Sequence, residues 1–332
     1  MINILELRPN PNSKSNGIDK YCKALRDLFA NDNDITILPV ENYPMKKNRF
    51  FKEMYKSGVL DKVLVDNDID IVHINGFASL SVIQCFRYAK NSGKKIVYTA
   101  HWHPFQYLNH PLRSKVFFYF LLKPLIKKYA DTVVTINNED TAFFKRFHNN
   151  VWQIPHWIEN NQSTCENLAD KDPSMILFVG RFNDPNKGAE HLFQLPEGKY
   201  NIHCVGPCDG ELRSDMTSHV NIPFKELSQL YAKASLLVVP SRYEAFSYVT
   251  LEALTYGTPV LLSNRVKIYD YLEGVQGVGV FHYHNYSEFN ESVASYIGCP
   301  VNKASIINAF KSDNIKEQYR KLLTQVYTNN YK

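Results

Sequence analysis

Short apolar runs alternate with longer segments of helical periodicity along almost the whole chain. In the first half, the pattern predicts strands at 2–7, 35–40, 69–74, 95–99 and 132–136. It predicts helices at 19–29, 52–66, 79–91, 114–129 and 140–147, and we expect Pro124 to strain the fourth of these helices. This alternation of strands and helices is typical of a parallel, doubly wound sheet.

A second series of the same kind follows the polar segment 158–173. Its predicted strands are 175–179, 201–205, 236–239 and 260–262, and its predicted helices are 189–192, 224–233, 248–256 and 315–327. The pattern therefore predicts an α/β protein with an N-terminal domain at 1–157, a linker at 158–173 and a second domain at 174–312. Two doubly wound domains joined in this way place a ligand site in the cleft between them, near the carboxyl ends of the strands.

Composition narrows the class of protein. The 332 residues are 44% hydrophobic and 21% charged, which fits a globular protein of two domains. No apolar run reaches the length of a membrane span, and the first residues do not have the pattern of a signal peptide. The six cysteines have neither CxxC nor zinc spacing, so we expect a reduced, cytoplasmic setting and no structural metal.

The positive charge lies in the first half of the chain. Residues 1–157 contain 22 Lys and Arg against 14 Asp and Glu, a balance of +8, and the remainder has a balance of −3. This asymmetry indicates an anionic partner, either nucleic acid or a membrane surface. Segments 46–56 and 113–128 mix cations with aromatic residues, which suits an anionic membrane but also suits core aromatics flanked by solvated lysines. We find no nucleic-acid-reading module and expect no nucleic-acid partner.

The stretch LLVVPSRYEAFSYVTLEALTYGTPVLLS carries the first candidate chemistry. Pro240 ends an apolar strand, and we expect a helix to begin near Ser247 with the serine side chain as its cap. A helix N-terminus at the carboxyl edge of a parallel sheet suits a diphosphate. Glu244 in the loop and Glu252 on the helix could hold hydroxyls at two ends of one ligand. Their spacing alone also fits two ordinary solvated glutamates.

Two further elements point to the same ligand. Arg181 and Lys187 follow a predicted strand that ends at Gly180, and two cations beside a diphosphate would neutralise the charge that grows as it leaves. A surface loop with two solvated cations is the alternative. His101 and His103 stand at the end of another strand, where a histidine serves either a reaction or a structural hydrogen bond.

The first stretch resembles the E-x7-E signature of the family 4 retaining glycosyltransferases of the bacterial surface-polysaccharide type, which have the GT-B fold. The positions that match are Pro240, Ser241, Glu244, Phe246, Glu252, Ala253, Gly257, Pro259 and Val260. The chain departs from the family at Ser247, where a glycine is usual. The resemblance implies two Rossmann-like domains facing across a cleft, with the C-terminal helix 313–332 packing back on the first domain.

The resemblance also implies roles for single residues. It implies that Glu244 contacts the donor sugar near the reacting carbon, that Glu252 holds the ribose hydroxyls, and that His101 lies near the anomeric centre. Catalytic roles are thus expected for Glu244, His101, Arg181 and Lys187. Donor binding is expected for Gly17, Gly180, Arg181, Lys187, Gly206, Phe246, Ser247, Tyr248 and Glu252.

The reaction implied is metal-independent transfer of a sugar, with retention of configuration, from a nucleotide-diphosphate donor to a saccharide or lipid-linked saccharide. No cofactor is expected, and a place in lipopolysaccharide or capsule synthesis, in the cytoplasm or peripherally at the inner face of the cell membrane, would follow. Two other functions stay open. Ser247, His156 and Trp157 depart from the family, which fits a non-catalytic GT-B subunit or nucleotide-sugar-binding scaffold. A GT-B nucleotide-sugar epimerase is the third function.

Overall fold

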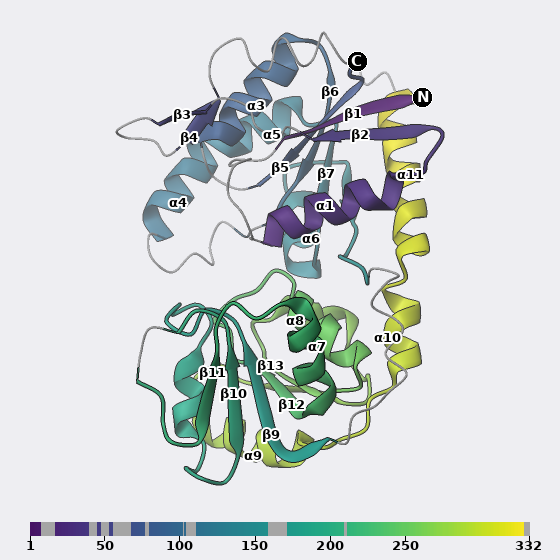
Figure 1. Ribbon diagram of the computed structural model, residues 1–332. Coiled ribbons are helices and arrows are strands. Elements are labelled where there is room, and N and C mark those ends of the chain that lie inside the picture. The colour runs from purple at the N-terminus through teal and green to yellow at the C-terminus, as the bar shows by residue number, and fades with distance from the viewer. Residues whose placement is uncertain are drawn as a thin grey trace. The chain divides into compact units, whose positions relative to one another are not determined.

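A computed structural model shows how the chain folds (Figure 1). The structure describes residues 1–7, 17–39, 45–47, 53–55, 68–76, 80–101, 103, 111–158, 171–208 and 211–328. The chain divides into two compact units, each described by itself. Unit 1 comprises Met1–His156 and Ser312–Lys332, and unit 2 comprises Trp157–Lys311.

Unit 1 contains a six-stranded parallel sheet in the order β2-β1-β5-β6-β7-β8. The strands are β1 (Ile2–Leu7), β2 (Ile35–Pro39), β5 (Ile71–Asn75), β6 (Lys95–Thr99), β7 (Thr132–Thr135) and β8 (Val151–Gln153). The helices are α1 (Gly17–Phe29), α3 (Leu80–Asn91), α4 (Pro111–Phe117), α5 (Lys123–Tyr129), α6 (Asn138–Lys145) and α11 (Ser312–Thr328). Every residue of β5 is buried, as expected for a parallel strand covered on both faces.

Helix α11 belongs to unit 1 although it lies at the other end of the chain (Figure 1). It packs against α1, where the hydroxyls of Tyr21 and Tyr319 are 2.6 Å apart and both side chains are buried. At the helix surface, Lys316 Nζ lies 3.1 Å from the Asp32 carboxylate, and Arg320 also pairs with Asp32. The apolar face of the amphipathic C-terminal segment is thus buried against the first unit.

One predicted helix is wrong in its described part. Residues 52–66 were expected to be helical, but β4 (Glu53–Tyr55) is a strand that pairs antiparallel with β3 (Met45–Lys47). The remaining residues of that prediction, 52 and 56–66, lie outside the described residues. Over three residues, hydrophobic periodicity does not distinguish a helix from a strand. The pairing of β4 with β3 determines that this segment is a strand.

The predicted helix 114–129 is confirmed, with the irregularity expected at Pro124. Between α4 and α5 lies a π-helical segment, η1 (Phe118–Leu122), in which Lys123 N donates to Phe118 O five residues earlier. Proline has no N–H, and its ring crowds the carbonyl four residues before it, which is that of Phe120. A wider turn just before Pro124 relieves this crowding.

Unit 2 repeats the architecture with the order β11-β10-β9-β12-β13-β14. Its strands are β9 (Asp172–Val179), β10 (Asn201–Val205), β11 (Met216–His219), β12 (Ala234–Val239), β13 (Val260–Ser263) and β14 (Val278–Phe281). Its helices are η3 (Ala189–Gln194), α7 (Phe224–Lys233), α8 (Tyr248–Thr255), η4 (Lys267–Tyr271), α9 (Tyr286–Tyr296) and α10 (Lys303–Ala309). Separate apolar clusters cover the two faces of the sheet, so the predicted doubly wound α/β class is confirmed.

The segment expected as a linker, 158–173, joins unit 2 at both of its described ends. Ile158 is buried in the unit 2 core, and its backbone N–H donates to Phe310 O at 3.0 Å. Strand β9 begins at Asp172. Residues 159–170 lie outside the described residues. Among the helices that the structure describes, none is long and apolar enough to cross a membrane.

Candidate functional site

Strands β9 and β12 are parallel neighbours, so the loops that follow them meet at the same edge of the unit 2 sheet. Gly188 ends the first loop with a φ of 70°, and a Cβ there would lie 1.9 Å from Pro240 O in the second loop. Arg242 N donates to Asn186 O at 2.8 Å, and the Asn186 amide donates to Tyr243 O at 2.9 Å. Only glycine permits this approach, and the hydrogen bonds hold the two loops in one arrangement.

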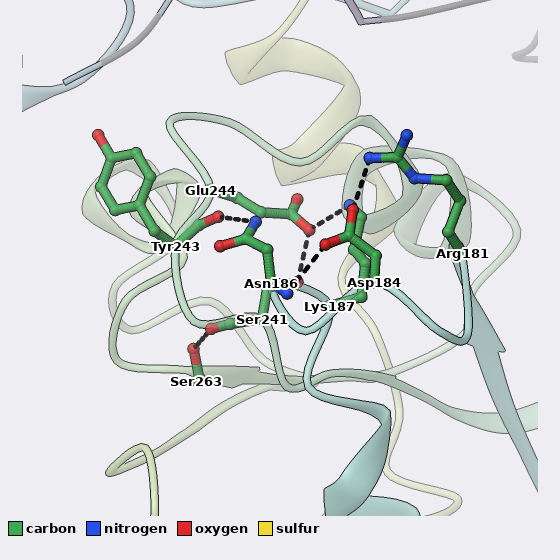
Figure 2. A network of polar contacts seen from close by, with 8 residues as sticks. All are labelled: Arg181, Asp184, Asn186, Lys187, Ser241, Tyr243, Glu244 and Ser263. Atoms are coloured by element: carbon green, nitrogen blue, oxygen red, sulfur yellow. Dashed lines mark hydrogen bonds and ion pairs between the residues drawn. The ribbon is translucent and has the colours of Figure 1, made fainter. Parts of the chain in front are cut away.

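Glu244 and Lys187 face each other across the two loops (Figure 2). Lys187 Nζ lies 2.8 Å from Glu244 Oε1, and Ser241 Oγ donates to the same oxygen at 2.6 Å. The Glu244 side chain is only 10% exposed. Ser263 Oγ in turn donates to Ser241 O at 2.5 Å, which ties the network to β13. A carboxylate and an ammonium held in this way are positioned before any ligand binds.

Arg181 stands apart from this pair. Its guanidinium Nη2 lies 2.5 Å from Asp184 Oδ2, while 70% of the Arg181 side chain is exposed. Asp184 also accepts a hydrogen bond from Asn186 N at 3.0 Å. The structure therefore brings Lys187 to Glu244 and holds Arg181 at the outer side of the same loop (Figure 2).

Helix α8 begins directly after this network, as predicted, but the expected serine cap is wrong. Ser247 occupies the N-cap position with φ −129° and ψ 101°, yet its side chain makes no capping hydrogen bond. Ser247 is 1% exposed, and its Oγ has no hydrogen-bond partner among the described residues. Phe246 packs edge-on against Phe310, so its ring belongs to the unit 2 core. Tyr248 is the first residue of α8.

Glu252, further along α8, is a buried carboxylate rather than a solvated one. The Tyr231 hydroxyl on α7 donates to Glu252 Oε2 at 2.9 Å. Burial raises the pKa of Tyr231 well above its ordinary value, and the neighbouring Glu252 charge raises it further. Tyr231 therefore stays a hydrogen-bond donor, and the bond fixes the rotamer of Glu252.

Three predicted glycines have different surroundings. Gly206 follows β10 with a φ of 130°, and a Cβ there would lie 2.3 Å from Gly180 O. The close approach of the chain at these two glycines joins the loops after β9 and β10. Gly17 is the first residue of α1, and a Cβ there would meet nothing within 4 Å. Residues 8–16, which precede Gly17, lie outside the described residues.

His101 belongs to unit 1, just after β6, and is surrounded by polar aromatic side chains. Its Nε2 lies 3.0 Å from Asn75 Oδ1. The Tyr21 ring meets it edge-on at 4.6 Å between centroids, and the His156 ring stacks on it at 6.1 Å. Burial lowers the pKa of His101 well below its ordinary value, as do His156 and then His73. His101 is therefore neutral at physiological pH and accepts or donates through an uncharged ring.

Sequence reasoning did not find these neighbours of His101. Tyr21 and Asn75 come from separate elements, and His156 was noted only as a departure from the family. His156 is buried, and burial lowers its pKa to about 3, so its ring is also neutral. His103 is buried as well, 5.0 Å from the Phe143 ring between centroids. Among the described residues no group of His, Cys, Asp and Glu could hold a metal ion.

A cavity of about 470 Å³ lies beside the unit 2 network. Its lining includes Asp184, Glu190 and Arg242. The Tyr283 hydroxyl lies 2.6 Å from Arg242 Nε and 3.0 Å from Glu190 Oε1, so it joins the two charged groups. This cluster braces the loop that carries Glu244, because Arg242 stands two residues before it in the chain.

Comparison with known proteins bears on what this site does. Residues 173–298, which carry the whole unit 2 network, match the family described as glycosyl transferases group 1. This match lies within unit 2 and does not extend to unit 1. The resemblance inferred from the E-x7-E stretch is therefore confirmed, and the fold is GT-B.

The relatives of this chain are distant. An uncharacterized 41.2 kDa protein in the cps region of Klebsiella pneumoniae is 25% identical over 259 residues, which are 71% of this chain and 70% of that protein. An uncharacterized glycosyltransferase of Methanocaldococcus jannaschii is 32% identical over 159 residues, 42% of this chain and 40% of that protein.

Solved structures share the fold over nearly the whole chain. Sucrose-phosphate synthase from Thermosynechococcus elongatus has a TM-score of 0.77 at 14% identity, with 98% of this chain and 99% of that chain covered. Anabaena HepE in complex with UDP and glucose has a TM-score of 0.70 at 15% identity, with 98% and 99% covered. These likenesses are to the fold alone.

Proposed function

We propose that this glycosyltransferase moves a sugar from a nucleotide-diphosphate donor to a saccharide or lipid-linked saccharide, with retention of anomeric configuration. The observation that carries the proposal is the Lys187–Glu244 pair, 2.8 Å between Nζ and Oε1, at the N-terminus of α8. A cation, a carboxylate and a helix N-terminus together suit the diphosphate and sugar of one donor.

Each group has a role in this proposal. Lys187 and the positive end of the α8 helix dipole stabilise the diphosphate as negative charge develops on it. Glu244 positions the donor sugar and stabilises the positive charge that grows at its anomeric carbon. Arg181, exposed on the same loop, adds a second cation for the diphosphate. Glu252, whose rotamer is fixed by the hydrogen bond from Tyr231, binds the ribose hydroxyls.

The proposed reaction forms no covalent intermediate on the enzyme, and one bond breaks for each bond that forms. The bond from the anomeric carbon to the diphosphate oxygen breaks, and the bond from that carbon to the acceptor oxygen forms on the same face. The acceptor proton passes to the departing phosphate oxygen. His101 is the residue of unit 1 for which the resemblance implies a role in the reaction, and its neutral ring can donate or accept a hydrogen bond without adding a positive charge.

Two features of related proteins support the choice of donor and pathway. HepE, which shares the fold, was solved with UDP-glucose, and one relative lies in a capsule region. We therefore propose a uridine diphosphate sugar as the first donor class to test and surface-polysaccharide synthesis as the setting.

The test is a panel of nucleotide sugars with release of nucleoside diphosphate as the readout, followed by NMR of the glycosylated product. We expect one donor to be turned over and the anomeric proton to keep the donor's configuration. Inverted configuration would contradict the retaining mechanism. Interconversion of two nucleotide sugars would indicate an epimerase, and donor binding without turnover on every acceptor would indicate a non-catalytic subunit.

A further inference from the structure

Helix α4 and the π-helical segment η1 of unit 1 expose an unusual amount of apolar surface. The described part of the chain has ten large hydrophobic side chains that are exposed, and five of them lie on α4 and η1. We call these five the α4–η1 face: Leu112, Val116, Tyr119, Phe120 and Leu121. Leu112 is 73% exposed and Phe120 is 75% exposed. Contiguous exposed apolar surface of this kind marks an interaction site.

The spacing of the α4–η1 face follows from the helix itself. Leu112, Val116, Tyr119 and Phe120 stand at i, i+4, i+7 and i+8, the pattern of one apolar stripe. The opposite side of the helix is already buried, at Phe118, Leu122 and Ile126. The π-helical turn between Phe118 and Leu122 inserts an extra residue, so three consecutive large apolar side chains point outward. The core therefore accounts for one side of this helix only.

Charge around the face selects the kind of partner. Lys115, Lys127 and Lys128 are exposed on the same helical segment. Lys123 Nζ lies 5.2 Å from the centre of the Tyr119 ring, so its stem lies along the apolar surface while its charge stays outside. Residues 71–130 contain nine basic residues and no acidic one. Cations at the rim of an apolar face suit anionic headgroups above a hydrocarbon layer.

We propose that the α4–η1 face docks this glycosyltransferase on an anionic lipid bilayer. A second copy of the chain is a poorer occupant, because the lysines of two such faces would repel each other. Only the purpose of membrane binding rests on the proposed function. A surface that inserts into lipid would bring a lipid-linked acceptor to unit 1. Membrane docking explains why Tyr119 and Phe120 of segment 113–128 are exposed; the side chains of segment 46–56 lie outside the described residues.

Vesicle flotation without any donor tests the proposal. We expect the full chain to float with vesicles of equal parts phosphatidylcholine and phosphatidylglycerol, to float poorly with phosphatidylcholine alone, and to be released by high salt. Leu112→Ser with Phe120→Ser should weaken binding about tenfold or more, because each removes an inserted apolar side chain. Val220→Ser with Phe224→Ser removes two exposed apolar side chains of unit 2 and should float as the wild type does.

The outcomes separate this proposal from the proposed function. Thermal unfolding of the Leu112/Phe120 variant should match the wild type, and its donor turnover without vesicles should be unchanged. A wild type that does not float on anionic vesicles at low salt overturns the proposal. So does equal flotation of the two double variants. A concentration-dependent dimer that the Leu112/Phe120 variant loses, with no flotation of the wild type, would assign the face to a second copy. Lack of donor turnover with normal flotation would contradict the proposed function alone.

Discussion

We predict that this protein loses stability in mild acid, because two histidines of unit 1 are buried. Burial lowers the pKa of His73 and of His156 to about 3 each, and the ordinary value is about 6.5. His73 Nε2 lies 2.7 Å from Thr99 Oγ1, and both imidazoles are buried among unit 1 side chains. The unfolded chain therefore binds a proton on each imidazole well before the folded chain does.

The sign and size follow from that difference. Because the folded pKa lies below the unfolded one, stability falls as pH drops below about 6.5 and the loss levels off near about 3. At about pH 5, each imidazole lies about 1.5 units below its unfolded pKa, and each unit corresponds to about 1.4 kcal/mol. Going from about pH 7.5 to about pH 5 should thus cost about 2 kcal/mol for each histidine. Burial also lowers the pKa of His101, so His101 adds to the loss in the same direction.

Urea unfolding at the two pH values measures this directly. In His156→Gln, the difference in unfolding free energy between the two pH values should shrink by about 2 kcal/mol, whatever the variant costs at neutral pH. His282→Gln is the matched control, because the His282 side chain is 72% exposed, and it should keep the full difference. A His156→Gln variant with the full acid dependence, or a wild type equally stable at both pH values, would refute the reasoning.

Three further predictions concern the unit 2 site. Gly188→Ala should lower the unfolding free energy by about 2 kcal/mol or more, since its Cβ would lie 1.9 Å from Pro240 O; denaturation within error of wild type would show that the loops are not locked. In steady-state kinetics, Lys187→Met should lower kcat about 10²- to 10³-fold, and Lys187→Arg should restore part of the lost kcat. An effect on KM alone would show that Lys187 binds the substrate in its ground state rather than stabilising the transition state. Ser247→Gly should change the melting stability by about 0.5 kcal/mol or less, because the hydroxyl caps nothing, and a larger loss in calorimetry would show a hidden partner.

Much of the fold could be predicted because parallel strands buried on both faces are near-continuous apolar runs. Strands β1, β6 and β10 begin and end at the predicted residues. The sequence reading missed β8, β11 and β14, and all three lie at sheet edges. Edge strands are short or polar, and β11 has the sequence MTSH, so only the neighbouring strand determines that they pair.

The candidate site was predicted less completely than the fold. Glu244, Lys187 and Glu252 were selected because they lie at a strand end and a helix start and because they match the signature of a known family. The bonds of Ser241 to Glu244 and of Tyr231 to Glu252 join residues whose contact depends on rotamers and loop geometry. The absence of a capping hydrogen bond from the Ser247 side chain likewise depends on its rotamer and on the loop geometry.

The surroundings of His101 could not be read from the chain for a different reason. Tyr21, Asn75 and His156 lie on α1, at the end of β5 and after β8, and only the folded sheet brings them together. A histidine that stacks on another histidine gives no local sequence pattern. The signal that was present, a histidine at position 156 where the family has another residue, was interpreted only as a departure.

The central claim is that the Glu244 carboxylate serves the donor sugar. Its most direct test compares the release of nucleoside diphosphate from the best donor by Glu244→Ala and by Glu190→Ala. Glu190 is a matched control, because it is a glutamate of the same unit bonded to Tyr283 rather than to Lys187. We expect Glu244→Ala to abolish turnover in a folded protein while Glu190→Ala keeps most of it. Near-normal turnover by Glu244→Ala would contradict the account.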